Sequence, residues 1–166
     1  MNKLEYEIRN TNAGLATVVA LACLTLNFSV WCAVKSPVIV LSFLSCKISV
    51  LPTWLFGLFD FLSFASLGFS LGAALGTACS ASEVSKYRGA FYFVIGITLA
   101  CAYHLFFFKL SSFLLSFLCA VLQCVCLFVA TANFYKVSAI SFFASVIGTL
   151  WSVYLLFFSF FATFCT

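Results

Sequence analysis

Charged side chains are scarce in this chain. Four acidic and eight basic residues make up 7% of the 166 residues, whereas 65% are hydrophobic. This composition leaves too little polar surface for a water-soluble domain of such length. The sequence therefore predicts an integral, multi-pass membrane protein, with no room for a second, soluble domain.

The basic residues are too scattered to form a nucleic-acid surface. The formal net charge is +4, but Lys and Arg stand singly or in small groups near the ends of apolar runs. At such positions they normally reach the lipid headgroups. Because no basic stripe is formed, we expect the lipid bilayer, and no nucleic acid, as a partner.

The chain also lacks the residues of common catalytic and metal sites. It has one histidine and no acid-rich cluster, so a tetrahedral metal site is not expected. The motifs G-x-S-x-G and H-E-x-x-H, a Walker loop and paired carboxylates are missing from the sequence. We therefore expect neither an enzyme nor a bound cofactor.

Cysteine, in contrast, is abundant, with nine in the chain. Several lie inside apolar runs, where a thiol behaves as a small hydrophobic side chain. The sequence leaves open whether a disulfide bond forms among the cysteines near the ends of the runs, which are Cys32, Cys46 and Cys79.

Five apolar runs are long enough to cross a hydrocarbon core of about 30 Å, which takes about 20 helical residues. They cover residues 13–34, 53–78, 90–108, 111–132 and 139–164. Their unbroken apolar character favours helices, because barrel strands would alternate polar and apolar residues. The prediction is an all-α, integral membrane five-helix bundle, with a polar segment at 1–12 and one transmembrane domain at 13–166.

The segment 36–51 has two interpretations. It is apolar, but it is short, contains Lys47 and lies between Pro37 and Pro52. It is either an interfacial or re-entrant segment or a short sixth span. We favour the first, because a short run with a lysine inside spans a membrane poorly.

Three glycines, Gly68, Gly72 and Gly76, recur every four residues and therefore share one face of the second helix. Small residues let another helix backbone approach closely within a membrane. This face predicts either packing inside the bundle, which we favour, or the seam of a dimer.

Asp60 and His104 are almost the only ionisable groups inside the apolar runs. An unpaired carboxylate costs about 2.5–3.5 kcal/mol at the centre of a membrane helix. We expect Asp60 to face the bundle or water and to find a donor, in a ligand-binding, proton-linked or purely structural role. His104 either reaches the headgroups beside Lys109, which we favour, or points inward to titrate or hold a polar ligand.

Two stretches carry a family resemblance. The chain reads K-I-S-V-L-P-T-W-L-F-G from Lys47 to Gly57 and F-Y-K-V-S from Phe134 to Ser138. With five spans and short turns between the last three, it resembles the translocator protein family, also called tryptophan-rich sensory proteins. The family patterns are K-P-S-W-x-P-P-x-W-V-F-G and F-x-R-V-S, and Asp60 stands where the family has a tryptophan.

The resemblance implies a pocket between helices that binds a hydrophobic or amphipathic ligand, of the porphyrin or sterol-like class. Aromatic side chains would enclose the ligand, while Asp60 and His104 would supply the polar contacts that orient it. The site residues that it implies are Trp54, Phe56, Asp60, Phe64, Tyr103, His104 and Trp151.

Other interpretations stay open. The chain could be a structural or scaffolding subunit without its own ligand, acting as a homodimer or in a larger membrane complex. The stretch F-D-F-L-S-F at 59–64 resembles a helix of the MARVEL-type organisers of membrane domains. A channel or transporter is less favoured, because the sequence shows no ring of charges and no inverted repeat.

Overall fold

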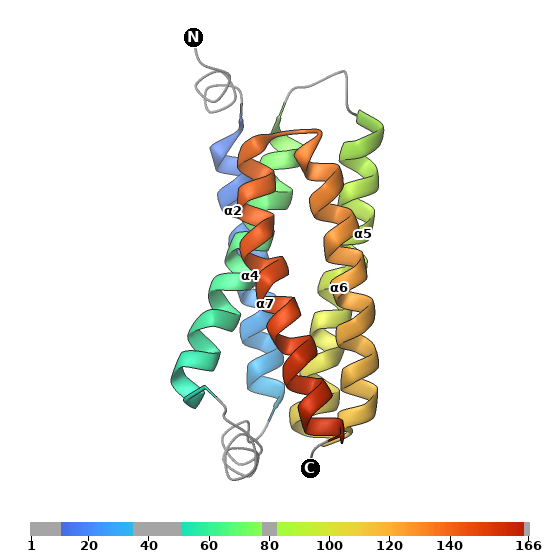
Figure 1. The fold of residues 1–166 in the computed structure, drawn as a ribbon. Helices are drawn as coiled ribbons and strands as arrows, with labels where there is room; N and C mark the ends of the chain where they lie inside the picture. Colours follow the sequence, from blue (N-terminus) through green and yellow to red (C-terminus); the bar gives the residue numbers. More distant parts are fainter. Residues whose placement is uncertain (1–10, 35–50, 78–82, 165–166) are drawn as a thin grey trace.

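A computed structural model describes residues 11–34, 51–77 and 83–164. Five long helices run side by side in this part of the chain (Figure 1). They are α2 (Ala13–Ala33), α4 (Thr53–Gly76), α5 (Glu83–His104), α6 (Phe113–Tyr135) and α7 (Ala139–Phe164). A π-helical turn, η2 (Leu105–Lys109), continues α5.

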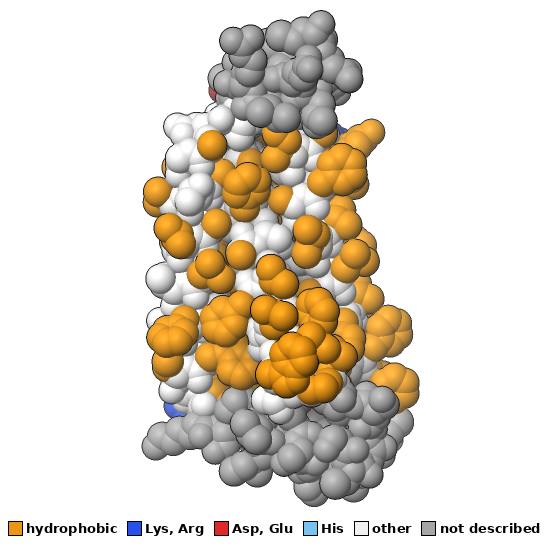
Figure 2. Space-filling model, turned by 90° about the vertical axis from the view of Figure 1, so that its left-hand side faces the viewer, with side chains coloured by type: hydrophobic (Ala, Val, Ile, Leu, Met, Phe, Trp, Pro, Cys, Tyr) orange, Lys and Arg blue, Asp and Glu red, His pale blue; other side chains and the backbone are white. Residues whose placement is uncertain are grey.

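All five helices, with η2 counted as part of α5, are long and apolar enough to cross a membrane. The predicted fold class and location are therefore confirmed: the chain is an all-α five-helix bundle and an integral, multi-pass membrane protein. Figure 2 shows hydrophobic side chains distributed over one face of the bundle from one end to the other. Large apolar side chains are exposed on the bundle: Phe91, Val125 and Leu150 each expose more than half of their surface. Such exposure is tolerated in the hydrocarbon of a membrane and is unfavourable in water.

The helix bounds differ from the apolar runs at some ends. α5 begins at Glu83, well before the predicted start at Ala90, because the helix continues through the polar turn that holds Lys86 and Arg88. Lys86 Nζ donates a hydrogen bond to the carbonyl oxygen of Thr77 at 3.2 Å. Except for Leu51, the segment 36–51 lies outside the described residues, as do residues 1–10 of the polar N-terminal segment.

The helices are not in sequence order around the bundle. α2 packs on α4, α4 on α7, α7 on α6 and α6 on α5. α7 thus lies between α4 and α6, while α5 closes the bundle on the far side of α6 (Figure 1).

Gly68, Gly72 and Gly76 of α4 face α2. A Cβ atom added to Gly72 would lie 2.5 Å from Cα of Ala16, and one added to Gly68 would lie 2.8 Å from Cα of Ala20. These distances leave no room for a side chain, so the two backbones are in direct contact. The glycine face is occupied by packing inside the bundle.

α4 and α7 cross closely at one level and separate at another. Gly148 of α7 packs directly against Leu67, and Ser70 Oγ donates a hydrogen bond to the carbonyl oxygen of Ser141 at 2.7 Å. From this crossing the two helices separate toward the N-terminal end of α4 (Figure 1). The separation leaves room for the site described below.

The glycine face yields a prediction for stability. Gly72→Leu should destabilise the bundle by about 1–3 kcal/mol, because the new side chain would overlap the α2 backbone. Thermal unfolding and gel filtration in detergent would measure this change. Gly57→Ala is the matched control, since its added Cβ would meet nothing closer than Trp31 Cη2 at 3.9 Å. Identical melting of G72L and wild type would show that the close approach contributes nothing.

Candidate functional site

The carboxylate of Asp60 is fully buried in α4 and is surrounded by N–H donors. Asn27 Nδ2 and Trp31 Nε1, both from α2, donate hydrogen bonds to Oδ2, each at 2.9 Å. Trp151 Nε1 from α7 donates to Oδ1 at 2.9 Å. Hydrogen bonds to a charged acceptor are strong, and here they offset the cost of removing the carboxylate from water.

His104, the last residue of α5, is the fourth partner of Asp60. Its Nε2 lies 3.1 Å from Oδ2, an ion-pair distance without good hydrogen-bond alignment. Its Nδ1 lies 2.7 Å from the carbonyl oxygen of Ala100. The side chain is only 1% exposed, so it points into the bundle and not toward the headgroups beside Lys109, the interpretation favoured from sequence.

Asp60, Asn27, Trp31, His104 and Trp151 form the Asp60 cluster. Through this cluster one carboxylate connects α4 with α2, α5 and α7. The cluster therefore fixes how these four helices lie relative to one another.

Aromatic rings seal the cluster from solvent. The ring centroid of Phe56 lies 5.2 Å from that of Trp151. The ring of Tyr103 lies 5.3 Å, and that of Phe64 6.2 Å, from the imidazole of His104. All three of these aromatic side chains are buried.

The structure thus brings together all of the predicted site residues except one. Phe56, Asp60, Phe64, Tyr103, His104 and Trp151 lie in or against the Asp60 cluster. Trp54, at the start of α4, instead exposes 71% of its surface. The gathered residues pack against one another, and of them only Trp151 lines the cavity described next.

Sequence reasoning missed Asn27 and Trp31. Both stand in the first apolar run, four residues apart, and so share a helix face. An amide inside an apolar span usually makes a hydrogen bond to another helix, and this was the available signal.

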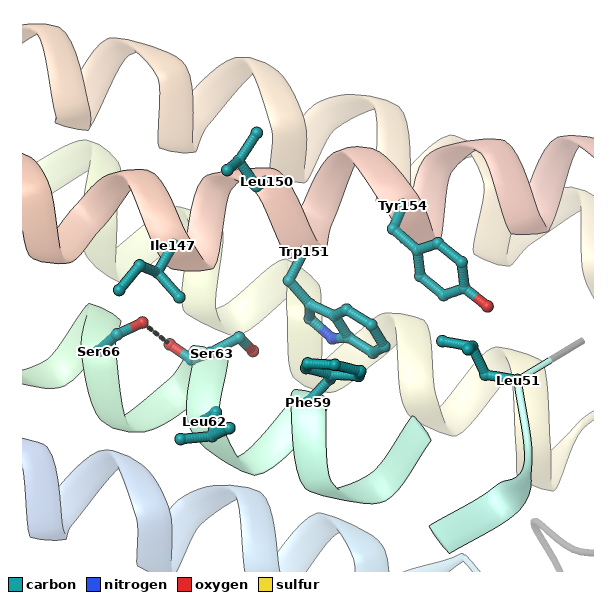
Figure 3. A pocket seen from close by; sticks show the side chains of 9 residues that line it. All are labelled: Leu51, Phe59, Leu62, Ser63, Ser66, Ile147, Leu150, Trp151 and Tyr154. Carbon is teal, nitrogen blue, oxygen red and sulfur yellow. Dashed lines mark hydrogen bonds between the residues drawn. The ribbon is translucent and has the colours of Figure 1, made fainter. Parts of the chain in front are cut away.

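A cavity of about 600 Å³ lies between α4 and α7, where these helices separate (Figure 3). We call it the α4–α7 groove. The ring of Trp151 stacks on that of Tyr154 at 4.8 Å and lies 5.7 Å from that of Phe59, and these three rings form one wall. Ile147 and Leu150 of α7 also line the groove and expose more than half of their surface, so the groove opens sideways to the lipid.

The groove offers few polar atoms. Ser66 Oγ donates to the carbonyl oxygen of Ser63 at 2.9 Å, and Ser63 Oγ donates to that of Asp60 at 2.7 Å, so both hydroxyl protons are used within α4. The hydroxyl of Tyr154 points toward Leu51 (Figure 3). No residue that lines the groove in the described part of the chain is charged. The groove is therefore suited to an uncharged, largely apolar molecule.

Comparison with protein-family models, with curated proteins and with solved structures gave no match for this chain. The resemblance to the translocator protein family stays a prediction from its sequence motifs.

The Asp60 cluster gives a second prediction for stability. Asp60→Leu should destabilise the bundle by about 3–5 kcal/mol, because it leaves the N–H groups of Asn27, Trp31 and Trp151 without an acceptor and removes the partner of His104. Thermal unfolding in nanodiscs would show the change. Asp60→Asn is the matched variant and should lose less, since its amide oxygen still accepts. Equal melting temperatures for D60L and wild type would contradict this account of the cluster.

Proposed function

We propose that this protein binds a hydrophobic or amphipathic small molecule in the α4–α7 groove. The main support is the size and lining of the groove. Its volume of about 600 Å³ falls within the range of about 300–1,000 Å³ that is usual for small-molecule sites. Apolar walls with a few polar atoms are also usual for such sites. The role proposed is binding, without a catalytic step.

A sterol-like ligand suits this groove better than a porphyrin. A flat, fused-ring molecule would pack on the stacked rings of Trp151 and Tyr154. Its single hydroxyl would find the hydroxyl of Tyr154 near Leu51 (Figure 3). A porphyrin carries carboxylates, for which the described lining residues supply no cation. The sideways opening would let the ligand enter from the bilayer.

A second candidate function is a structural or scaffolding subunit without its own ligand. The observation that favours it is that both oxygens of Asp60 already accept hydrogen bonds from the chain itself. A buried polar group that is satisfied in this way can serve packing alone. Such a subunit would act as a homodimer or in a larger membrane complex, and it would show no saturable binding of small molecules.

Binding of a fluorescent sterol to protein in nanodiscs, followed by energy transfer from tryptophan, separates the two candidates. Ligand binding predicts a saturable signal. Ser66→Phe should weaken it by about tenfold or more, because the new ring would fill the groove.

Ala132→Phe is the matched control and should bind as wild type does. Ala132 lines a different, smaller cavity of about 300 Å³ between α6 and α7. A signal that does not saturate, or equal affinities for S66F and A132F, would contradict binding in the groove. Tighter saturable binding of a porphyrin than of the sterol would contradict the ligand class.

A further inference from the structure

The contact between Asp60 and His104 requires a proton. A carbonyl oxygen only accepts hydrogen bonds, so the Nδ1 atom that faces Ala100 carries a hydrogen. If Nε2 carried none, its lone pair would face a carboxylate oxygen 3.1 Å away. One proton between Nε2 and Oδ2 removes this repulsion. The pair is then neutral overall, either as imidazolium and carboxylate or as neutral ring and neutral acid.

The surroundings make the loss of this proton costly. Asp60 is the only buried acidic residue in the described part of the chain, and no Lys or Arg is buried there. Lys109, at the end of η2, is exposed. The titratable side chains that interact with Asp60 besides His104 are Cys101 and Tyr103, both on α5. Cys23 on α2 interacts with Cys101, and Tyr154 on α7 with Tyr103. On α6, Cys124 Sγ donates to Ser152 Oγ. Deprotonation would therefore leave one negative charge without a positively charged partner inside hydrocarbon.

Trp151 connects this pair with the groove. Its indole nitrogen donates to Oδ1 of Asp60, and its ring is part of the groove wall. His104 stands directly before η2, and single π-helical turns are frequent at functional sites. A change in the charge of the pair would therefore act on the side chain that shapes the groove.

We infer that Asp60 and His104 form a reversible binding site for one proton, and that its occupancy sets the position of Trp151. The bound proton is carried by Nε2 or by Oδ2, and on release it leaves the ring neutral and the carboxylate charged. The carboxylate and the ring then repel each other, and the Trp151 hydrogen bond changes with them. The inference does not depend on the proposed ligand, and it is tested without one.

The composition makes this test specific. Asp60 is the sole aspartate and His104 the sole histidine of the chain. Isotope-labelled histidine, studied by ¹⁵N NMR of the full chain in nanodiscs, therefore reports Nδ1 and Nε2 of one residue. Labelled aspartate reports one carboxyl group by infrared spectroscopy. Tryptophan emission of Trp54→Phe protein follows the two indoles that bond to Asp60.

Between about pH 4 and about pH 9 we expect one single-proton step, at the same pH in all three signals. Nε2 should change its protonation, and Nδ1 should keep its hydrogen. In the W54F background, the double substitution Asp60→Asn and His104→Gln should abolish the emission step, because neither amide titrates. Cys101→Ala should retain it, which excludes the neighbouring thiol.

Three results would overturn the inference. One is a flat response of Nε2 in the wild-type chain over this range. Another is an Nε2 step with no change in the emission of the two indoles. The third is an emission step that persists in the D60N/H104Q variant. The NMR and infrared readouts use the unsubstituted chain, so they decide the question even if the D60N/H104Q variant does not fold.

Discussion

A carboxylate inside hydrocarbon must be surrounded by polar partners, and in this bundle one carboxylate contacts polar side chains of three other helices. Asp60 accepts from Asn27 and Trp31 of α2 and from Trp151 of α7, and it faces His104 of α5. Lipid gives little hydrophobic drive between helices, so polar contacts and close backbone approach decide how the helices pack. Here the glycine face fixes α2 on α4, and the Asp60 cluster adds α5 and α7.

The same constraint shapes the groove. α4 and α7 are in tight contact at Gly148 and at the Ser70 hydrogen bond, and they separate toward Leu51. Trp151 lies where the two helices begin to separate. Its indole nitrogen is hydrogen-bonded to Asp60, while its ring faces outward and lines the groove. The polar core and the apolar groove therefore share one side chain. This shared residue is the physical basis for linking a charge in the core to the shape of the surface.

The sequence predicted five membrane-crossing helices, because hydrocarbon thickness and apolar composition determine how many such runs the chain contains. It also predicted that Asp60 needs a donor, since the cost of an unpaired carboxylate is general. It did not predict which donors, because every face of these helices is apolar and periodicity could not order them around the bundle. Asn27 lies 33 positions from its partner, and only the packing of α2 on α4 brings the two together. The sequence also did not reveal the position of the cavity. The aromatic residues predicted to enclose a ligand mostly fill the core, and the cavity lies beside them.

The central claim is that the Asp60 carboxylate holds the indole N–H groups of two tryptophans inside the bundle. Hydrogen–deuterium exchange of the indole protons, measured by NMR on the chain in nanodiscs, tests this most directly. The account predicts slow exchange for Trp31 and Trp151 and fast exchange for Trp54, which is 71% exposed. Equal exchange rates for all three indoles would contradict it.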